Sequence, residues 1–178
     1  SGIDQIGLKV SEEQQNKLLD YLALLHKWNK FYNLTAVRDP QQMVSNPLLD
    51  SLVIVPHLWS GRWLDVGCGA GLPGLVLAIV RPEWRLDLLD SNSKKTGFVQ
   101  QVMIELSLKN VSVHCVRIEA WKTDIRFDGI ISRAFTELGG FLRSTQHLLA
   151  PQGRWAAMKG QPEHELLGVG KEYRVEQV

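Results

Sequence analysis

Residues 63–74 read Trp63-Leu64-Asp65-Val66-Gly67-Cys68-Gly69-Ala70-Gly71-Leu72-Pro73-Gly74. The apolar start of this run predicts a buried strand, and its alternating glycines predict a tight turn that leads into a helix. Because glycine tolerates positive φ and lets a ligand approach the backbone, the turn is a candidate ligand cradle. The other interpretation is a strand-to-helix turn that binds no ligand. Such a turn requires neither three glycines nor an acidic residue near them.

Two nucleotide cofactors fit this loop, a nicotinamide dinucleotide and S-adenosylmethionine. The run from Gly69 to Gly74 matches the dinucleotide fingerprint G-x-G-x-x-G. Asp90 ends the next predicted strand and suits the ribose hydroxyls of either cofactor, although it also suits a helix cap. The glycine run begins earlier, at Gly67, and the carboxylate of Asp65 would repel a pyrophosphate but attract the ammonium of a methionine moiety. We therefore expect S-adenosylmethionine as the cofactor.

Around this loop the sequence alternates predicted strands with predicted helices. That alternation is typical of an α/β fold with a mostly parallel sheet and helices on both faces. The predicted strands are Arg62–Val66, Arg85–Leu89, Val111–Val116, Phe127–Ser132, Arg154–Met158 and Tyr173–Val178. The predicted helices are Pro73–Val80, Lys94–Leu108, Glu137–Leu149 and Glu163–Leu167. Ligands of such sheets bind beyond the carboxyl ends of the strands, where the strand order reverses, so the residues that follow each strand are the candidate site.

The first third of the chain has helical periodicity instead. Ser11 and Gln14 predict a capping box at a helix start, and Asp39, followed by proline, predicts a second start. The apolar face of the first helix consists of Leu18, Leu22, Leu25 and Trp28. We expect residues 1–61 to form an N-terminal helical cap on a core of residues 62–178, within one compact domain.

The composition excludes several classes of protein. The 178 residues are 44% hydrophobic and 22% charged, as in an ordinary globular domain. No apolar run approaches the roughly 18 residues of a membrane span, and no signal segment is present, so we expect a cytoplasmic protein without membrane association. Cys68, Cys115 and the five histidines have no ligand spacing, so we expect no metal. With a net charge of +1, any nucleic-acid contact must come from a local basic face.

Residues near the predicted strand ends have both functional and ordinary interpretations. Ile118 and Glu119 follow the third strand, where they can contact an adenine, but an ordinary surface glutamate fits nearly as well. Arg133 ends the fourth strand and can bind cofactor, base or phosphate, or form a surface salt bridge. Lys159 ends the fifth strand and can meet a phosphate. A wider basic rim is predicted from Lys94, Lys95 and Arg38.

Six short motifs follow one another along the chain, and the ordered set is specific although each motif is weak. They are Asn33-Leu34-Thr35, Leu49-Asp50-Ser51-Leu52, the glycine loop ending in Leu72-Pro73-Gly74, Leu88-Leu89-Asp90-Ser91, Ile131-Ser132-Arg133-Ala134 and Lys159-Gly160. With them the chain resembles the bacterial small-subunit ribosomal RNA guanine-N7 methyltransferase family, also called glucose-inhibited division protein B. The resemblance implies a class I S-adenosylmethionine-dependent methyltransferase fold with a helical N-terminal cap, and methylation of a guanine N7 in a 16S rRNA loop. The cofactor contacts that it implies are Gly67, Leu72, Ile118, Glu119 and Arg133.

The sequence departs from this family in two places. Asn46-Pro47 stands where the family usually has Arg-His, which puts any RNA contact of that pair in doubt. The last predicted strand also lacks the further strand with which it would pair, so we expect the natural protein to continue past Val178.

The expected reaction is compatible with the residues at the strand ends. Guanine N7 carries a lone pair and no proton, so methyl transfer from a sulfonium needs positioning rather than a general base. The fourth strand is followed by Arg133-Ala134-Phe135, without the Asn/Asp-Pro-Pro-aromatic motif of amino-nitrogen methyltransferases. Neither cysteine is placed as the nucleophile that carbon-5 methylation requires.

These observations define the predicted site. The predicted catalytic residues are Arg133, Asn33, Asp50 and Lys159, of which Asn33 and Asp50 either read the edges of guanine or cap turns. The predicted cofactor contacts are Asp65, Gly67, Gly69, Gly71, Leu72, Asp90, Ile118, Glu119 and Arg133. The expected substrate is 16S ribosomal RNA or a small-subunit assembly intermediate, bound by a monomer. The alternatives are a methyltransferase for a small molecule or protein, and a cofactor-binding ribosome-assembly factor without turnover.

Overall fold

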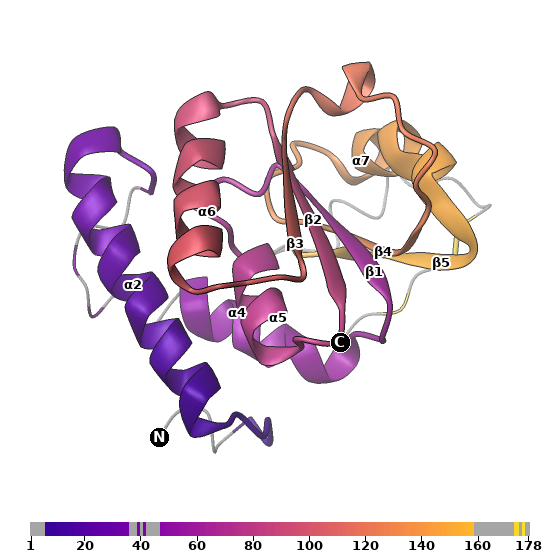
Figure 1. Cartoon of the computed structure of the whole chain (residues 1–178). Coiled ribbons are helices and arrows are strands. Elements are labelled where there is room, and N and C mark those ends of the chain that lie inside the picture. The colour runs from indigo at the N-terminus through magenta and orange to yellow at the C-terminus, as the bar shows by residue number, and fades with distance from the viewer. Residues whose placement is uncertain are drawn as a thin grey trace.

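The computed structural model describes residues 6–35, 39, 41, 47–158, 173, 174 and 176. Its centre is a five-stranded, all-parallel sheet with the order β3-β2-β1-β4-β5 (Figure 1). The strands are β1 (Arg62–Val66), β2 (Arg85–Asp90), β3 (Val111–Cys115), β4 (Phe127–Ser132) and β5 (Leu149–Ala157). The parallel sheet that the sequence predicts is confirmed, and β1 and β4 have the predicted bounds.

Helices cover both faces of the sheet, as the alternation of elements predicts (Figure 1). The helices are α2 (Glu12–Tyr32), α4 (Leu49–Ile54), α5 (Gly74–Val80), α6 (Ser93–Glu105) and α7 (Leu138–Thr145), with short 3-10 helices η2 (Val55–His57), η3 (Ile118–Ala120) and η4 (Gln146–Leu148). Neighbouring residues of β1 point to opposite faces: Trp63 packs with α2, α4, α5 and α6, and Leu64 packs with α7. Among the described helices, none has the length and apolar character needed to cross a membrane.

The long helix α2 begins where the sequence predicts. The side chain of Ser11 accepts a hydrogen bond from the Gln14 N–H at 3.1 Å, and the Gln14 side chain accepts from the Ser11 N–H at 2.9 Å, which completes the capping box. Leu18 and Leu25 are buried, and Leu22 and Trp28 pack partly buried against the same core, so the predicted apolar face is confirmed. Helix α2 therefore packs on α5 and α6, which contact the sheet.

Some predicted elements differ from the observed ones. The predicted helix Glu137–Leu149 is wrong at its end, because Leu149 pairs with Phe127 and begins β5. A short apolar run such as the one around Leu149 does not distinguish a helix end from a buried strand. Tyr173 and Arg174, which the sequence places in a last strand, have no strand backbone. The predicted helix Glu163–Leu167 lies outside the described residues.

The strand order reverses between β1 and β4, which are neighbours in the sheet although far apart in sequence. The chain leaves β1 toward α5 on one face and leaves β4 toward α7 on the other (Figure 1). Ser132, the last residue of β4, donates through Oγ to the carbonyl oxygen of Val66, the last residue of β1, at 2.8 Å. The two strand ends are thus joined at the point where ligands of such sheets bind.

Candidate functional site

The glycine loop between β1 and α5 has the backbone conformation that its glycines predict. The φ angles are +70° at Gly67, +53° at Gly69 and +94° at Gly71, all in the left-handed region. The N–H groups of Gly67 and Cys68 donate to the carbonyl oxygen of Leu89 in β2 at 2.8 and 3.0 Å. A Cβ placed on Gly69 would meet no atom within 4 Å. The loop is therefore bound to β2 on one side and open beside Gly69.

Asp65, two residues before the loop, is fully buried. Its Oδ2 accepts a hydrogen bond from the Gly74 N–H at 2.9 Å, whereas its Oδ1 has no partner in the described part of the chain. Burial raises the pKa of this carboxyl to about 7, against the opposing effects of the Gly74 bond and the nearby Arg133. Because an unpartnered buried carboxylate oxygen is costly, a cation brought to Oδ1 would be stabilising.

Asp90 fastens the loop from the end of β2. Its Oδ2 accepts from the Gly69 N–H at 2.9 Å, and its Oδ1 accepts from the Asn92 N–H at 2.9 Å. Asn92, not Asp90, caps α6, because its side chain accepts from the backbone of Lys94 and Lys95. Each oxygen of Asp90 has a further lone pair, so the carboxylate can also accept from the hydroxyls of a ribose.

Tyr21 is a part of this site that the sequence reasoning missed. Its hydroxyl donates to the carbonyl oxygen of Ala70 at 2.7 Å, and its side chain is fully buried, which raises the pKa of the phenol. Helix α2 thus holds the glycine loop in addition to β2. The signal was present, because the spacing with Leu18 and Leu25 puts Tyr21 on the buried face, and a buried tyrosine needs a partner for its hydroxyl.

Arg133 lies close to the glycine loop at the end of β4. It is half-buried, and its charge opposes the burial that raises the pKa values of Asp65 and Tyr21. A Cβ on Gly67 would come within 3.0 Å of the Ala134 Cβ, so the chain after β4 packs against the glycine loop. The structure therefore puts Arg133 at the strand end that lies against the glycine loop, and the contact of Arg133 with cofactor or base stays a prediction.

The other predicted cofactor contacts lie around the same edge. Ile118 and Glu119 are in η3, just after β3, where Ile118 is half-buried and Glu119 is exposed. The N–H of Val116 donates to the carbonyl oxygen of Asp90 at 3.1 Å, which joins the ends of β3 and β2. Leu72 is half-buried and packs against the core within the loop itself. The carboxyl ends of four strands thus contribute to one region.

Two of the other predicted catalytic residues, Asn33 and Asp50, lie on helices ahead of β1. Asn33 is exposed and ends α2 in the left-handed conformation, with its N–H donating to the carbonyl oxygen of Asn29 at 3.3 Å. Asp50 is exposed in the first turn of α4, where a negative charge favours the helix. Lys159 lies outside the described residues, as do Arg38 and Asn46. The structure shows Asn33 as the residue that caps the end of α2. The contact of Asn33 and of Asp50 with the edges of guanine stays a prediction.

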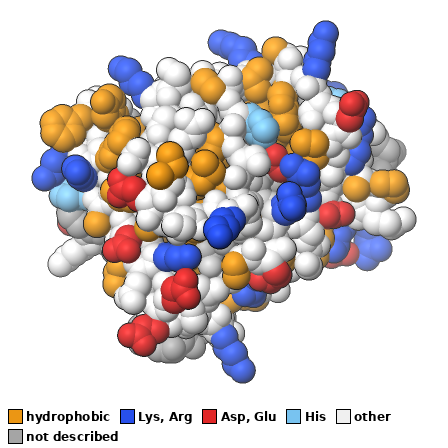
Figure 2. Space-filling view, viewed as in Figure 1, with side chains coloured by type: hydrophobic (Ala, Val, Ile, Leu, Met, Phe, Trp, Pro, Cys, Tyr) orange, Lys and Arg blue, Asp and Glu red, His pale blue; other side chains and the backbone are white. Residues whose placement is uncertain are grey.

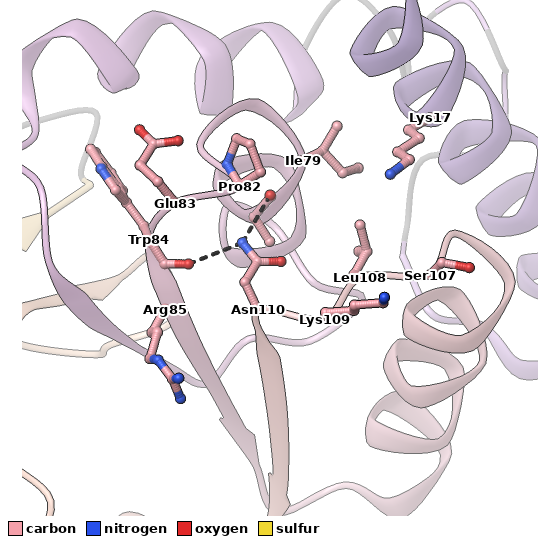
Figure 3. Close-up of a pocket in the computed structure, with 11 residues that line it drawn as sticks. Lys17, Ile79, Pro82, Glu83, Trp84, Arg85, Ser107, Leu108, Lys109 and Asn110 are labelled. Carbon is pink, nitrogen blue, oxygen red and sulfur yellow. Dashed lines mark hydrogen bonds between the residues drawn. The ribbon is translucent and has the colours of Figure 1, made fainter.

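A cavity of about 390 Å³ lies at the opposite edge of the sheet (Figure 3). It is lined by Arg85, which begins β2, and by Asn110, which precedes β3. The Asn110 side chain donates to the carbonyl oxygens of Ala78 and Trp84, both at 3.1 Å, and so fastens α5 to the start of β2. The cavity is therefore at the amino ends of the strands, away from the glycine loop.

Comparisons with known proteins agree with this geometry. The sequence profile of the family described as rRNA small subunit methyltransferase G matches residues 14–178. A protein of Pseudomonas paraeruginosa named Ribosomal RNA small subunit methyltransferase G is 55% identical over 177 residues, which cover 98% of this chain and 83% of that protein. A protein of the same name from Methylobacillus flagellatus is 52% identical over 168 residues, covering 94% of this chain and 82% of that protein.

Solved structures with the same fold are more distant in sequence. Coclaurine N-methyltransferase bound to N-methylheliamine and SAH has a TM-score of 0.57 at 16% identity, over 78% of this chain and 43% of that one. The DhpI-SAM-HEP complex has a TM-score of 0.52 at 16% identity, over 93% of this chain and 76% of that one. These likenesses confirm the expected class I methyltransferase fold, and the close relatives confirm the resemblance seen in the sequence. The chain belongs to the rRNA small subunit methyltransferase G family.

Proposed function

We propose that this chain is an S-adenosylmethionine-dependent methyltransferase that modifies N7 of a guanine in 16S ribosomal RNA. The observation that carries the proposal is the glycine loop, which is fastened by Asp90 and Tyr21 and lies beside the unpartnered Oδ1 of Asp65. The names of the close relatives support ribosomal RNA of the small subunit as the substrate. The proposal includes a cytoplasmic location, because bacterial ribosomal RNA is found there.

The residues around the loop fit the parts of S-adenosylmethionine. The open side of Gly69 gives the ligand access to the loop backbone, and Asp90 can accept from the ribose hydroxyls. Asp65 suits the methionine ammonium, although direct contact requires neighbouring side chains to move because Asp65 is fully buried. Ile118 and Glu119 follow β3 at the carboxyl end of the sheet, which supports the expected contact with the adenine. When bound, the cofactor supplies an electrophilic methyl group on a sulfonium.

The chain's own residues then have positioning roles. Guanine N7 has a lone pair and no proton to lose, so no side chain need act as a general base. Arg133 directly follows β4 and precedes Ala134, which lies against the glycine loop, and this position supports a role in orienting the cofactor or the base. Burial raises the pKa of the Cys68 thiol, which keeps this side chain protonated and unsuited to nucleophilic catalysis. Asn33, Asp50 and Lys159 are proposed to contact the RNA.

Cofactor binding and methyl transfer test the proposal separately. In titration calorimetry the protein should bind S-adenosylmethionine and S-adenosylhomocysteine but not NAD. With a cofactor labelled in its methyl group, the label should then appear in 16S rRNA. Binding of NAD alone would overturn the cofactor assignment. Label in a small molecule or a protein would overturn the substrate assignment while leaving the cofactor assignment intact.

A further inference from the structure

Helix α2 changes its charge along its length. Three acidic residues lie within residues 12–20, whereas residues 21–35 contain no aspartate or glutamate and include the exposed Lys27 and Lys30. Residues 27, 30 and 31 share one face of the helix, because positions three and four apart are neighbours. The end of α2 is therefore positively charged in a chain whose net charge is only +1.

The start of α6 extends this positive region. Lys94 and Lys95 lie in its first turn, and residues 91–104 contain no acidic residue. The end of α2 and the start of α6 lie at the same end of the molecule (Figure 1). Asn92, the N-cap of α6, and Gly69 of the glycine loop both donate their N–H groups to the carboxylate of Asp90, so the first turn of α6 is close to the glycine loop.

A row of aromatic rings connects the glycine loop to the surface at this place. The ring centroids of Tyr21 and Phe98 are 6.3 Å apart, and those of Phe98 and Trp28 are 5.7 Å apart. Trp28 in turn lies 5.3 Å from Tyr32. Tyr32 is 46% exposed, and its neighbour Phe31 is 76% exposed. The row begins at the residue that holds the loop and ends in the exposed ring of Tyr32, and Phe31, the preceding residue in the sequence, is exposed as well.

Exposed aromatic side chains at the end of a helix that also carries exposed lysines suit one kind of partner. Unpaired nucleobases stack on exposed aromatic rings, while their phosphates attract lysines. Figure 2 shows hydrophobic side chains beside Lys and Arg over the upper end of α2. A paired RNA helix keeps its bases stacked inside and offers them to no aromatic ring, so the rings select a single-stranded segment.

We propose that Phe31, Tyr32, Lys27, Lys30 and Lys94 form a stacking surface for unpaired bases of the substrate RNA. This α2 stacking surface rests on the proposed function, because it assigns a second RNA contact beside the site of methyl transfer. It binds nucleotides that flank the target guanine, and the aromatic row fixes its position relative to the glycine loop.

The test compares Phe31→Ala with Leu19→Ala, a matched control. Leu19 is 62% exposed and lies on the same helix, in its acidic half. Phe31→Ala should raise the dissociation constant for an unmodified 16S rRNA transcript by about fivefold or more, because the loss of one stacked base costs this much. Leu19→Ala should leave it unchanged. Phe31→Trp should restore binding, and both alanine variants should bind S-adenosylhomocysteine as the wild type does.

The lysine variants should change the salt dependence of RNA binding, and a lysine outside the surface provides their control. Lys30→Ala should reduce the slope of log K against log salt by roughly 0.7 to 1, as expected for one lost phosphate contact. Lys17→Ala should not change the slope, because Lys17 lies in the acidic half and pairs with Glu13 at 3.3 Å. Phe31→Ala should weaken binding with the slope unchanged, since stacking releases no counterions.

Several outcomes would overturn the inference. It fails if Phe31→Ala binds the transcript as tightly as Leu19→Ala does. It also fails if Phe31→Ala weakens binding to small-subunit particles but not to free RNA, because the surface would then take a ribosomal protein. If the wild type binds S-adenosylhomocysteine but no 16S rRNA, the proposed substrate is wrong, and the assignment of the α2 stacking surface is wrong with it.

Discussion

The substitution Asp65→Asn removes a charge from a fully buried position and keeps the shape of the side chain. The carbonyl oxygen of the new side chain can still accept from the Gly74 N–H. The ordinary pKa of the Asp65 carboxyl is 3.8, and burial in the folded protein raises it to about 7. Between these two pH values the folded state holds a proton that the unfolded state has released.

This difference gives the wild-type protein a stability that falls with rising pH. Because the folded-state pKa is the raised one, the contribution of Asp65 is fully present below about pH 4 and is lost as the pH rises through about 7. From pH 5 to pH 8 the loss amounts to about 3 kcal/mol, at about 1.4 kcal/mol for each pH unit below the folded-state pKa. An asparagine has no proton to release in this range. The free energy of unfolding of the variant should therefore not decrease in this way as the pH rises.

Urea unfolding of both proteins without cofactor, at pH 5 and at pH 8, measures the effect. The free energy of unfolding of Asp65→Asn, relative to wild type, should rise by about 3 kcal/mol between the two pH values. Any cost of the new, unpartnered amide is the same at both pH values and cancels. A relative stability that stays constant within about 1 kcal/mol would refute the reasoning, because Asp65 would then have an ordinary pKa.

The same variant tests the proposed contact with the cofactor ammonium. An ammonium beside Asp65 favours the ionised carboxylate, so binding of S-adenosylmethionine at pH 6 should release about one proton from the wild type. Calorimetry in two buffers of different ionisation enthalpy measures that proton. Asp65→Asn should release none and bind more weakly. Equal proton release by both proteins would remove Asp65 from the cofactor site.

Three further substitutions test other parts of the structure. Tyr21→Phe removes the donor to Ala70, so urea unfolding should show a loss of about 1 to 2 kcal/mol and calorimetry a weaker cofactor affinity; unchanged values would show that α2 does not hold the loop. Gly69→Val places a branched side chain at a φ of +53° on the open side of the loop. It should abolish cofactor binding in calorimetry while circular dichroism shows a folded protein, and tight binding would place the ligand elsewhere. Burial opposes ionisation of Asp87, but hydrogen bonds, first from His114, outweigh it and lower the pKa. This stabilisation is present above about pH 4 and is lost as the pH falls, so the melting temperature of Asp87→Asn should lie further below wild type at pH 7 than at pH 3; an equal gap would contradict this.

The sequence predicted those parts of the molecule that depend on local spacing. The glycine run, the strand that leads into it and Asp90 at the end of the next strand are close in sequence, and the structure brings them together as expected. The capping box of Ser11 and Gln14 is a local motif too, and it was also predicted. Such features are encoded within short windows, where propensity and pattern suffice.

Other features depend on packing between distant segments. The bond from Tyr21 to Ala70 spans 49 residues, and only the docking of α2 creates it. The complete burial of Asp65 likewise follows from the elements around β1, so its raised pKa was not apparent from the sequence. Leu149 was assigned to a helix because its neighbours are apolar, whereas its pairing with Phe127 determines its strand conformation.

Identification of the methylated atom tests methyl transfer to guanine N7 most directly. Unmodified 16S rRNA is incubated with the protein and with S-adenosylmethionine labelled in its methyl group, then digested to nucleosides for mass spectrometry. The label should appear as 7-methylguanosine from a single position, and Gly69→Val should give none. Label in an N²-methylguanosine, a 5-methylcytidine or a ribose methyl would show that guanine N7 is not the acceptor, because those acceptors lack the proton-free nitrogen on which the proposed chemistry depends.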